Sequence, residues 1–213
     1  MALKYSDLKV GDVLLKHSAG SKTNVVIKTG QAIFSHNRSG GTADIVHAAL
    51  YAGNVGGGQV IFEASGPGLI REDMSGNGLS YEVYRYKNAD VASLAAMVAE
   101  GYVAETNKSK SVQAKGHYGS YSITGAAGSL FHSSTRGQGA QAAEAGLWGR
   151  SANPAANSFY CSNFVVRAFQ AAGQTFQPKI VPIDADYRYI SPKEMQSKLN
   201  QSADWSHPGR IIG

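Results

Sequence analysis

The residues IVHAALYAGNVGGGQVIFEA, numbers 45–64, form the clearest pair of strands in the sequence. Two apolar runs, 45–53 and 59–64, flank a short glycine-rich connection, a pattern that is typical of a β-hairpin. A hairpin centred on Val55 places His47 opposite Glu63, and directly opposed residues have side chains about 5 Å apart on one face of the sheet. A one-residue shift in register would separate the two side chains.

The second clear pattern is helical and includes the only cysteine of the chain, Cys161. Apolar residues recur along one face of a helix at positions 161, 164, 165, 168, 169 and 172. We expect a helix over 158–172 that stops at Gly173. Cys161 then lies in the first turn, where exposed backbone N–H groups and the positive end of the helix dipole stabilise a thiolate. The alternative is that Cys161 is simply packed in the core, as free cysteines often are.

The other expected elements have weaker patterns. The expected strands are 7–16 (after a turn at Gly11), 68–71 and 80–86, and the expected helices are 23–35, 89–105 and 191–199. Ser191-Pro192-Lys193-Glu194 is a capping box with proline at the first helical position, and it opens the last of these helices. Residues 106–157 are rich in Gly, Ala, Ser and Gln, so we expect an insertion or a lid there.

The composition is that of one folded domain. The chain has 213 residues, of which 43% are hydrophobic and 16% charged, which excludes a disordered chain. We therefore expect a single α+β domain over residues 1–213. The net charge of +5 suits an anionic partner only weakly, because the basic residues are scattered. No transmembrane segment and no secretory signal are predicted, so synthesis in the cytoplasm is expected.

A cysteine nucleophile needs a general base, usually histidine, and a third group that orients the base. Of the six histidines, His47 alone lies within a strongly predicted strand, and the others lie in segments typical of a solvated surface. Glu63 is the group that the hairpin would bring to His47, although a polar residue at a strand end is the alternative interpretation. Cys161, His47 and Glu63 are therefore the candidate catalytic residues. No metal-binding or phosphate-binding motif is present, and no cofactor is expected.

Four short motifs resemble the NlpC/P60 family of papain-like cysteine peptidases and amidases. They are YCSNFV at 160–165, DIVHAALY at 44–51, VIFEA at 60–64 and GDVLL at 11–15. The histidine precedes the cysteine, which resembles the circularly permuted branch with its YiiX/YaeF-like amidases and lecithin:retinol acyltransferase-like proteins. The resemblance implies a papain-like core, in which a small antiparallel sheet packs against the helix that carries the nucleophile.

The sequence also departs from the family pattern. Tyr160 replaces the aspartate that often precedes the cysteine, and Ala49 replaces a glycine after the histidine. The acyltransferase-like branch favours a second histidine where Glu63 stands, so the chain resembles the amidases more. Tyr160, Tyr51 and Ser162 are the candidate substrate contacts.

The resemblance implies hydrolysis of amide bonds in the stem peptides of bacterial peptidoglycan. Because no signal is predicted, we also expect an antibacterial effector delivered into the periplasm of target bacteria by a type VI secretion system, with a carrier and an immunity protein as partners. One alternative is a lipid acyltransferase or thioesterase, with residues 120–149 as a lipid-facing lid. Another is a binding module without catalysis, although no nucleic-acid-binding motif is present and no nucleic-acid partner is expected.

Overall fold

The computed structural model describes residues 2–18, 44–65, 68–111, 159–176 and 178–213. These residues form an α+β fold with a six-stranded antiparallel sheet and three α-helices. The strands are β1 (Val13–His17), β2 (Ile45–Val55), β3 (Gly58–Ser65), β4 (Gly68–Asp73), β5 (Ser80–Tyr86) and β6 (Trp205–Ile212). The helices are α2 (Ala89–Ser111), α5 (Cys161–Gln174) and α6 (Pro192–Gln201), and a 3-10 turn, η1, covers Tyr5–Asp7.

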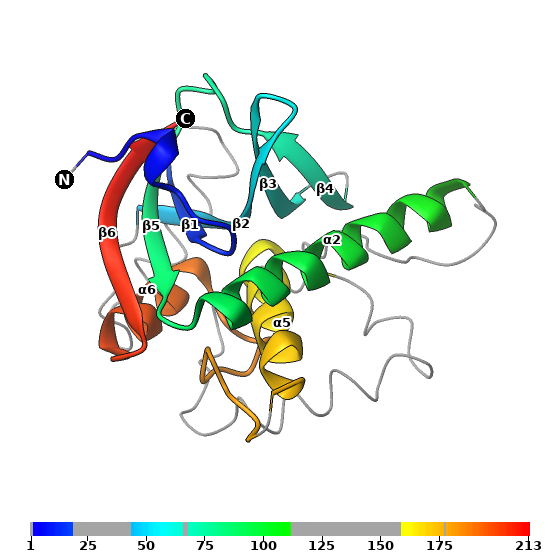
Figure 1. Cartoon of the computed structure of the whole chain (residues 1–213), viewed down its shortest axis with the longest axis vertical. Helices are drawn as coiled ribbons and strands as arrows, with labels where there is room; N and C mark the ends of the chain where they lie inside the picture. The colour runs from blue at the N-terminus through cyan, green and yellow to red at the C-terminus, as the bar shows by residue number, and fades with distance from the viewer. Residues whose placement is uncertain (1, 19–43, 66–67, 112–158, 177) are drawn as a thin grey trace.

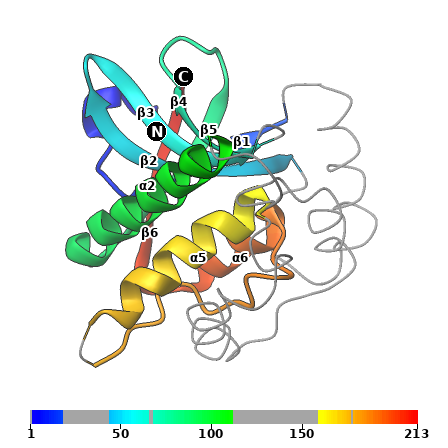
Figure 2. The same cartoon turned by 90° about the vertical axis from the view of Figure 1, so that its right-hand side faces the viewer.

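The sheet has the strand order β4-β3-β2-β1-β5-β6, with β4 and β6 at its edges. Figures 1 and 2 show α2 and α5 together on one side of the strands, with α6 beside α5. The main hydrophobic core lies between this side of the sheet and the helices. Its sheet residues alternate along each strand, as Val13 and Leu15 do on β1, because successive side chains of a strand point to opposite faces.

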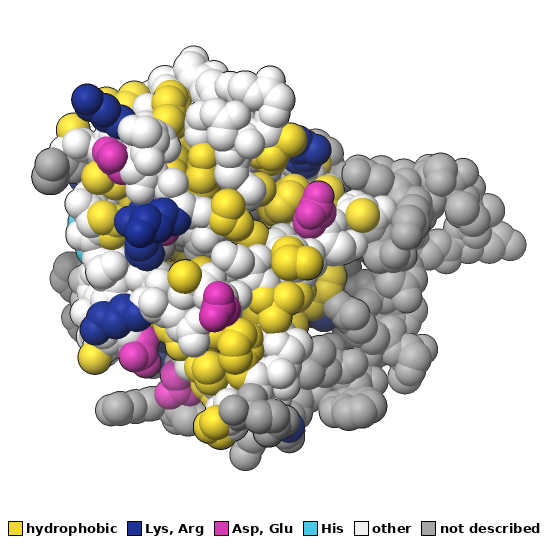
Figure 3. Space-filling model, in the orientation of Figure 1, with side chains coloured by type: hydrophobic (Ala, Val, Ile, Leu, Met, Phe, Trp, Pro, Cys, Tyr) yellow, Lys and Arg dark blue, Asp and Glu magenta, His cyan; other side chains and the backbone are white. Residues whose placement is uncertain are grey.

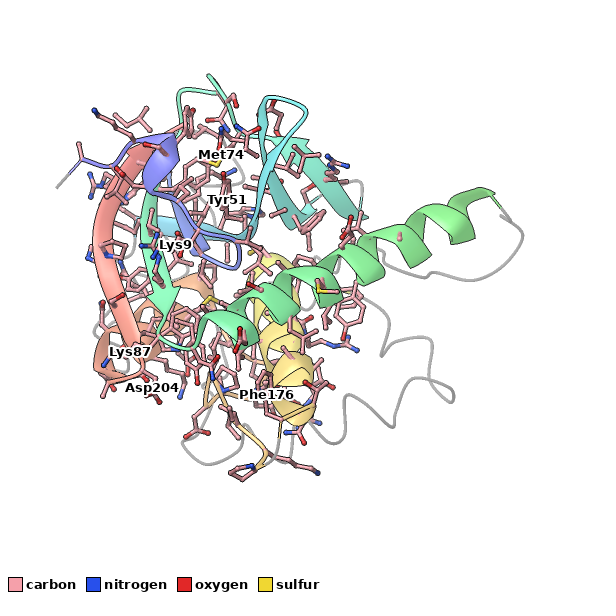
Figure 4. The ribbon with its side chains drawn as sticks, in the orientation of Figure 1. Lys9, Tyr51, Met74, Lys87, Phe176 and Asp204 are labelled. Atoms are coloured by element: carbon pink, nitrogen blue, oxygen red, sulfur yellow. The ribbon has the colours of Figure 1, made fainter. Side chains whose placement is uncertain are left out.

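The opposite face of the sheet carries a second, smaller cluster. Leu14 and Ala49 belong to it, as do Tyr51 and Met74, which Figure 4 labels beside the strands. The sheet is therefore apolar over parts of both faces, and a residue's parity along its strand decides whether it faces the helices or this second cluster.

The register of the β2–β3 hairpin differs from the prediction. Val55 pairs with Gly58, so the turn is the two residues Gly56 and Gly57, and both have positive φ angles (65° and 90°), as a type I′ turn requires. Glu63 is opposed to Ala49 and not to His47. The predicted pairing was wrong because the hairpin turns between Gly56 and Gly57, whereas the prediction centred it on Val55.

Helix α5 confirms the predicted apolar stripe but not the predicted stop. All six stripe residues are buried, with exposed fractions between 0% and 3%. The helix continues past Gly173 to Gln174 and ends on Thr175, which has helical φ and ψ. Gly173 has another role: a Cβ there would lie 2.2 Å from the carbonyl oxygen of Ile180, so the residue permits close approach of the next segment.

Strand β6 was missed, because Pro208 and Gly209 interrupt its apolar pattern. It is an edge strand beside β5, where a proline is tolerated, and its pairing shifts register near Gly209.

The helix expected at 23–35 lies outside the described residues. Helix α2 extends to Ser111 and so includes the start of the segment 106–157. The remainder of that segment belongs to residues 112–158, which lie outside the described residues. The single domain over 1–213 therefore stays a prediction.

On one face of the molecule, the charged side chains are dispersed. On the face drawn in Figure 3, Lys and Arg side chains lie apart from one another and are interspersed with Asp and Glu. Among the helices of the described residues, we find none with the length and apolar character that a membrane span requires.

Candidate active site

Cys161 is the first residue of α5, and its side chain is buried, with 3% of the residue exposed. The preceding residue, Tyr160, is extended (φ −126°), and its side chain does not cap the helix. The first intrahelical bond runs from the Phe164 N–H to the Tyr160 carbonyl at 3.0 Å. The N–H groups of the first turn therefore face the position of the cysteine without a competing side-chain cap, which favours a thiolate there.

His47 and Glu63 form a hydrogen-bonded pair. His47 Nε2 lies 2.9 Å from Glu63 Oε2, and the two side chains are 12% and 7% exposed. They are diagonal neighbours on one face of the hairpin, two positions away from the direct opposition that the sequence predicted. A shift of two residues keeps every side chain on its face, since the side-chain period of a strand is two, and so the predicted contact is present despite the wrong register.

A β-bulge is what gives the two residues the same face. Tyr51 pairs with Ile61 but Gly53 with Val60, so Ala52 is an extra residue on β2. Without this extra residue, the strand pairing next to the turn, in which Val55 is opposed to Gly58, would continue along the hairpin. His47 and Glu63 would then point to opposite faces of the sheet. Gly53, whose φ is 113°, supplies the left-handed backbone that such bulges often use.

Cys161 meets His47 where the ladder between β2 and β3 ends. The last pair of that ladder joins Ala49 to Glu63, and hydrogen bonding from the backbone of the next residue, Ala48, helps to lower the pKa of Cys161. The charge of His47 and hydrogen bonding from its side chain also lower the pKa of Cys161, against the effect of burial, so the two side chains lie close together. Because Nε2 of His47 is engaged by Glu63, Nδ1 is the ring nitrogen available to the sulfur. The three predicted catalytic residues thus lie in one contiguous chain of contacts.

The electrostatics of this chain favour an ion pair. Burial alone would lower the pKa of His47, but the negative charges of Cys161 and Glu63 and their hydrogen bonds outweigh it and raise the pKa to about 9. Burial would raise the pKa of Cys161, but the His47 charge and the hydrogen bonds from His47, Ala48 and Ser162 lower it. Both shifts favour a thiolate beside an imidazolium, which is the reactive state of a cysteine nucleophile.

Glu63 is held ionised by the same surroundings. Its burial would raise its pKa, but the charge and hydrogen bond of His47, together with the charge of Lys16, lower it. An ionised Glu63 accepts the Nε2–H of His47 and so fixes which ring nitrogen faces the cysteine.

The three candidate substrate contacts are engaged within the protein. The Ser162 hydroxyl donates to the Ile190 carbonyl at 2.5 Å, and the Tyr160 hydroxyl donates to the Tyr187 carbonyl at 3.0 Å. Tyr51 belongs to the second hydrophobic cluster, and its hydroxyl is within 2.5 Å of Gln59 Oε1. Ser162 and Tyr160 flank the cysteine, whereas Tyr51 lies farther along β2. A role in contacting substrate stays a prediction for all three.

Sequence reasoning missed two further groups of polar residues. His17 and His207, expected to be solvated, each hydrogen bond to one oxygen of Glu82, at 2.8 and 2.7 Å, and Arg210 shares that carboxylate. Lys16, Glu72 and Tyr81 surround Glu63 and His47. Alternation within a strand does not say which strands are neighbours. Lys16 and Tyr81 lie beside the candidate site because β1 pairs with both β2 and β5.

Within the described ranges, no group of three or more His, Cys, Asp and Glu side chains is placed to hold a metal ion. No protein-family model matches this chain, and no curated protein sequence matches it. The chemistry of the site therefore has to be argued from its own geometry.

Proposed function

We propose that this protein is a cysteine hydrolase with the catalytic triad Cys161, His47 and Glu63. The observation that supports it is the contiguous arrangement of a cysteine at a helix N-terminus, a histidine whose pKa is raised to about 9, and a buried carboxylate 2.9 Å from that histidine. Structural cysteines in hydrophobic cores do not need a charged partner, and burial without one raises a thiol pKa. The lowered pKa of Cys161 supports the proposal that it is a nucleophile.

The triad performs acyl transfer in two stages. The Cys161 thiolate attacks the carbonyl carbon of an amide, a C–S bond forms, and the carbonyl electrons move to oxygen. The tetrahedral intermediate then collapses, and the leaving amine departs with the proton of the His47 imidazolium. His47, now neutral, takes a proton from water, which attacks the thioester and releases the acid and the thiolate.

Two features of the fold assist these steps. Glu63 stabilises the imidazolium and keeps its Nδ1 directed at the sulfur. Backbone N–H groups of the first turn of α5 are the donors for the oxyanion, and loss of one such donor typically costs a factor of about 10²–10³ in rate.

We propose bacterial peptidoglycan as the substrate and the circularly permuted NlpC/P60 class as the family. The support is the resemblance of the motifs around His47, Glu63 and Cys161, in that order along the chain. The net charge of +5 suits an anionic polymer only weakly, because the basic residues are scattered. Delivery as an antibacterial effector to the periplasm of target bacteria follows from the same resemblance and is part of the proposal.

The test uses purified sacculi. Wild type, Cys161→Ala and the control Met97→Ala, an exposed position on α2, are incubated with sacculi, and released fragments are identified by mass spectrometry. We expect new stem-peptide ends from wild type and from the control, and none from Cys161→Ala. Fragments released equally by Cys161→Ala would overturn the nucleophile. Intact sacculi with all three folded proteins would overturn the substrate, and an acyl adduct on Cys161 after incubation with lipids would then support the acyltransferase alternative.

A further inference from the structure

The segment between α5 and α6 runs back along α5 toward the start of that helix (Figure 2), and we call residues 183–190 the return segment. Polar side chains of α5 hold its backbone. The Gln170 amide donates to the Ala185 carbonyl at 2.7 Å, and the Asn163 amide donates to the Tyr187 carbonyl at 3.1 Å. The path of the return segment is therefore fixed by the helix that carries the nucleophile.

The last residues of the return segment are anchored on both chain neighbours of Cys161. Before the cysteine, the Tyr160 hydroxyl donates to the Tyr187 carbonyl at 3.0 Å. After it, the Ser162 hydroxyl donates to the Ile190 carbonyl at 2.5 Å. The two residues between these anchored carbonyls therefore lie beside the start of α5, next to the residues that precede and follow the nucleophile.

Those two residues are Arg188 and Tyr189, and both are exposed. A buried carboxylate holds the arginine: Nε of Arg188 lies 2.9 Å from Oδ1 of Asp186, and Nη2 lies 2.6 Å from Oδ2. The Arg188 side chain is 56% exposed, whereas that of Asp186 is 4% exposed. The guanidinium carbon also lies 5.4 Å from the centre of the Tyr189 ring. Arg188 is thus an ordered cation whose Nη1 makes no hydrogen bond within the described part of the chain.

We propose that Arg188 is a specificity-determining residue that binds a carboxylate of the substrate. The substrate class is then a peptide with a free carboxylate within two or three residues of the amide that Cys161 cleaves. This inference rests on the proposed function of Cys161, His47 and Glu63, and it specifies the substrate of that site.

The chemistry of the arginine supports a carboxylate as its ligand. A guanidinium has five N–H donors in one plane, so it can donate to Asp186 and to a second carboxylate at once. Because Asp186 already orders the side chain, a ligand does not have to immobilise it on binding. An extended peptide advances about 3.3 Å per residue, so a substrate held at Cys161 passes its neighbouring residues along the return segment. An anionic polymer such as peptidoglycan supplies carboxylates of this kind.

Alkylation of Cys161, the only cysteine of the chain, tests the proposal without hydrolysis. Two bromoacetyl dipeptides are compared, one that ends in a carboxylate and one that ends in a carboxamide, and the rate of labelling is followed by mass spectrometry. The proteins are wild type, Arg188→Gln, Arg188→Lys and the control Arg210→Gln. Arg210 is a matched control because it is 53% exposed and is likewise paired with a buried carboxylate, Glu82, on the edge of the sheet.

The ratio of the two labelling rates, acid over amide, is the readout. We expect Arg188→Gln to lower this ratio about 10-fold, the effect of losing a hydrogen bond to a charged group. Arg188→Lys should give an intermediate ratio, because lysine keeps the charge and loses the planar fork. Arg210→Gln should match wild type. A substitution that only displaced the return segment would slow both reagents alike and leave the ratio unchanged.

Hydrolysis gives the second readout. Soluble stem peptides from sacculi are used directly and after their carboxyl groups have been amidated with carbodiimide and ammonia. We expect Arg188→Gln to raise KM for the untreated peptides about 10-fold with little change in kcat, because the lost contact binds substrate and transition state alike. For the amidated peptides, Arg188→Gln and wild type should have the same KM.

The two proposals fail in different ways. Equal acid-to-amide ratios in wild type and Arg188→Gln would overturn the carboxylate site, whatever the protein hydrolyses. An equal fall of the ratio in Arg210→Gln would also overturn it, since the overall charge and not the position of Arg188 would then be the cause. A fall confined to the variants of Arg188, without hydrolysis of stem peptides by wild type, would support the carboxylate site and overturn peptidoglycan as the substrate.

Discussion

Replacing Glu63 with glutamine should lower the pKa of His47 measurably. The pKa of His47 is raised from 6.5 to about 9 against the effect of burial, by Cys161 and Glu63 together. That rise of about 2.5 units corresponds to about 3 kcal/mol in favour of the protonated ring. Glu63 supplies one of the two negative charges, and its Oε2 is 2.9 Å from the ring. We therefore expect Glu63→Gln, which keeps the size of the side chain, to lower the pKa of His47 by about 1–2 units.

The two anions can be separated by a cycle of variants. Cys161→Ala reports the effect of Glu63 alone, Glu63→Gln reports Cys161 alone, and the double variant retains only burial, which should bring the pKa of His47 below 6.5. Imidazole nitrogen shifts followed by NMR against pH give the pKa in each protein, and comparison with His47→Gln identifies the signal among the six histidines.

The same titration predicts a pH dependence of stability. A histidine with a raised pKa in the folded protein stabilises it fully below the unfolded value of 6.5, and this contribution is lost as the pH rises through about 9. In Glu63→Gln this stabilising contribution of protonated His47 should be lost at a lower pH than in wild type. A wild-type His47 that titrates near 6.5, or a pKa that neither variant changes, would refute the triad electrostatics derived from the structure.

Two further predictions concern packing. Gly173→Ala should destabilise the protein by more than about 2 kcal/mol, because the new Cβ would collide with the Ile180 carbonyl oxygen. The matched helical change Gly101→Ala places its Cβ where no atom lies within 4 Å, so it should stabilise the protein by about 0.5–1 kcal/mol. Equal melting temperatures for the two variants would contradict this account. Trp205→Phe removes an indole N–H that donates to the Pro182 carbonyl at 2.8 Å, and urea unfolding should show a loss of about 1–3 kcal/mol.

The candidate site was predictable from sequence because its residues lie in strong local patterns. The apolar stripe that begins at Cys161 defined the helix and put the cysteine in its first turn, as the structure shows. The hairpin pattern also predicted His47 and Glu63 on one face, but in the structure this depends on the bulge at Ala52, which the pattern does not contain. The predicted substrate contacts had no such pattern, since a side chain beside a nucleophile can face the solvent or the core, and Ser162 is fully buried.

The rest of the site depends on contacts that no local pattern contains. Glu72 lies near Glu63 only because β4 pairs with β3, and Lys16 meets His47 only because the first strand inserts between β2 and β5. Strand β6 escaped prediction for a related reason, since a proline and a glycine hide its alternation and its place beside β5 is a long-range choice. The order of the strands in the sheet depends on how both faces of the sheet are buried, and residues from every element contribute to that burial.

Ala52, the extra residue of the β2 bulge, lets one hairpin both pack against α5 and bring His47 and Glu63 together. Helix α5 needs an apolar face of the sheet to pack on, and β2 and β3 supply it with side chains such as Leu50 and Phe62. The triad needs two charged groups on one face, near the end of the same hairpin. The bulge at Ala52 meets both needs, because it reverses the relative parity of the two strands between the turn and the site. With unbroken register, His47 and Glu63 would point to opposite faces of this hairpin, and His47 would lose one of the two anionic partners that raise its pKa to about 9.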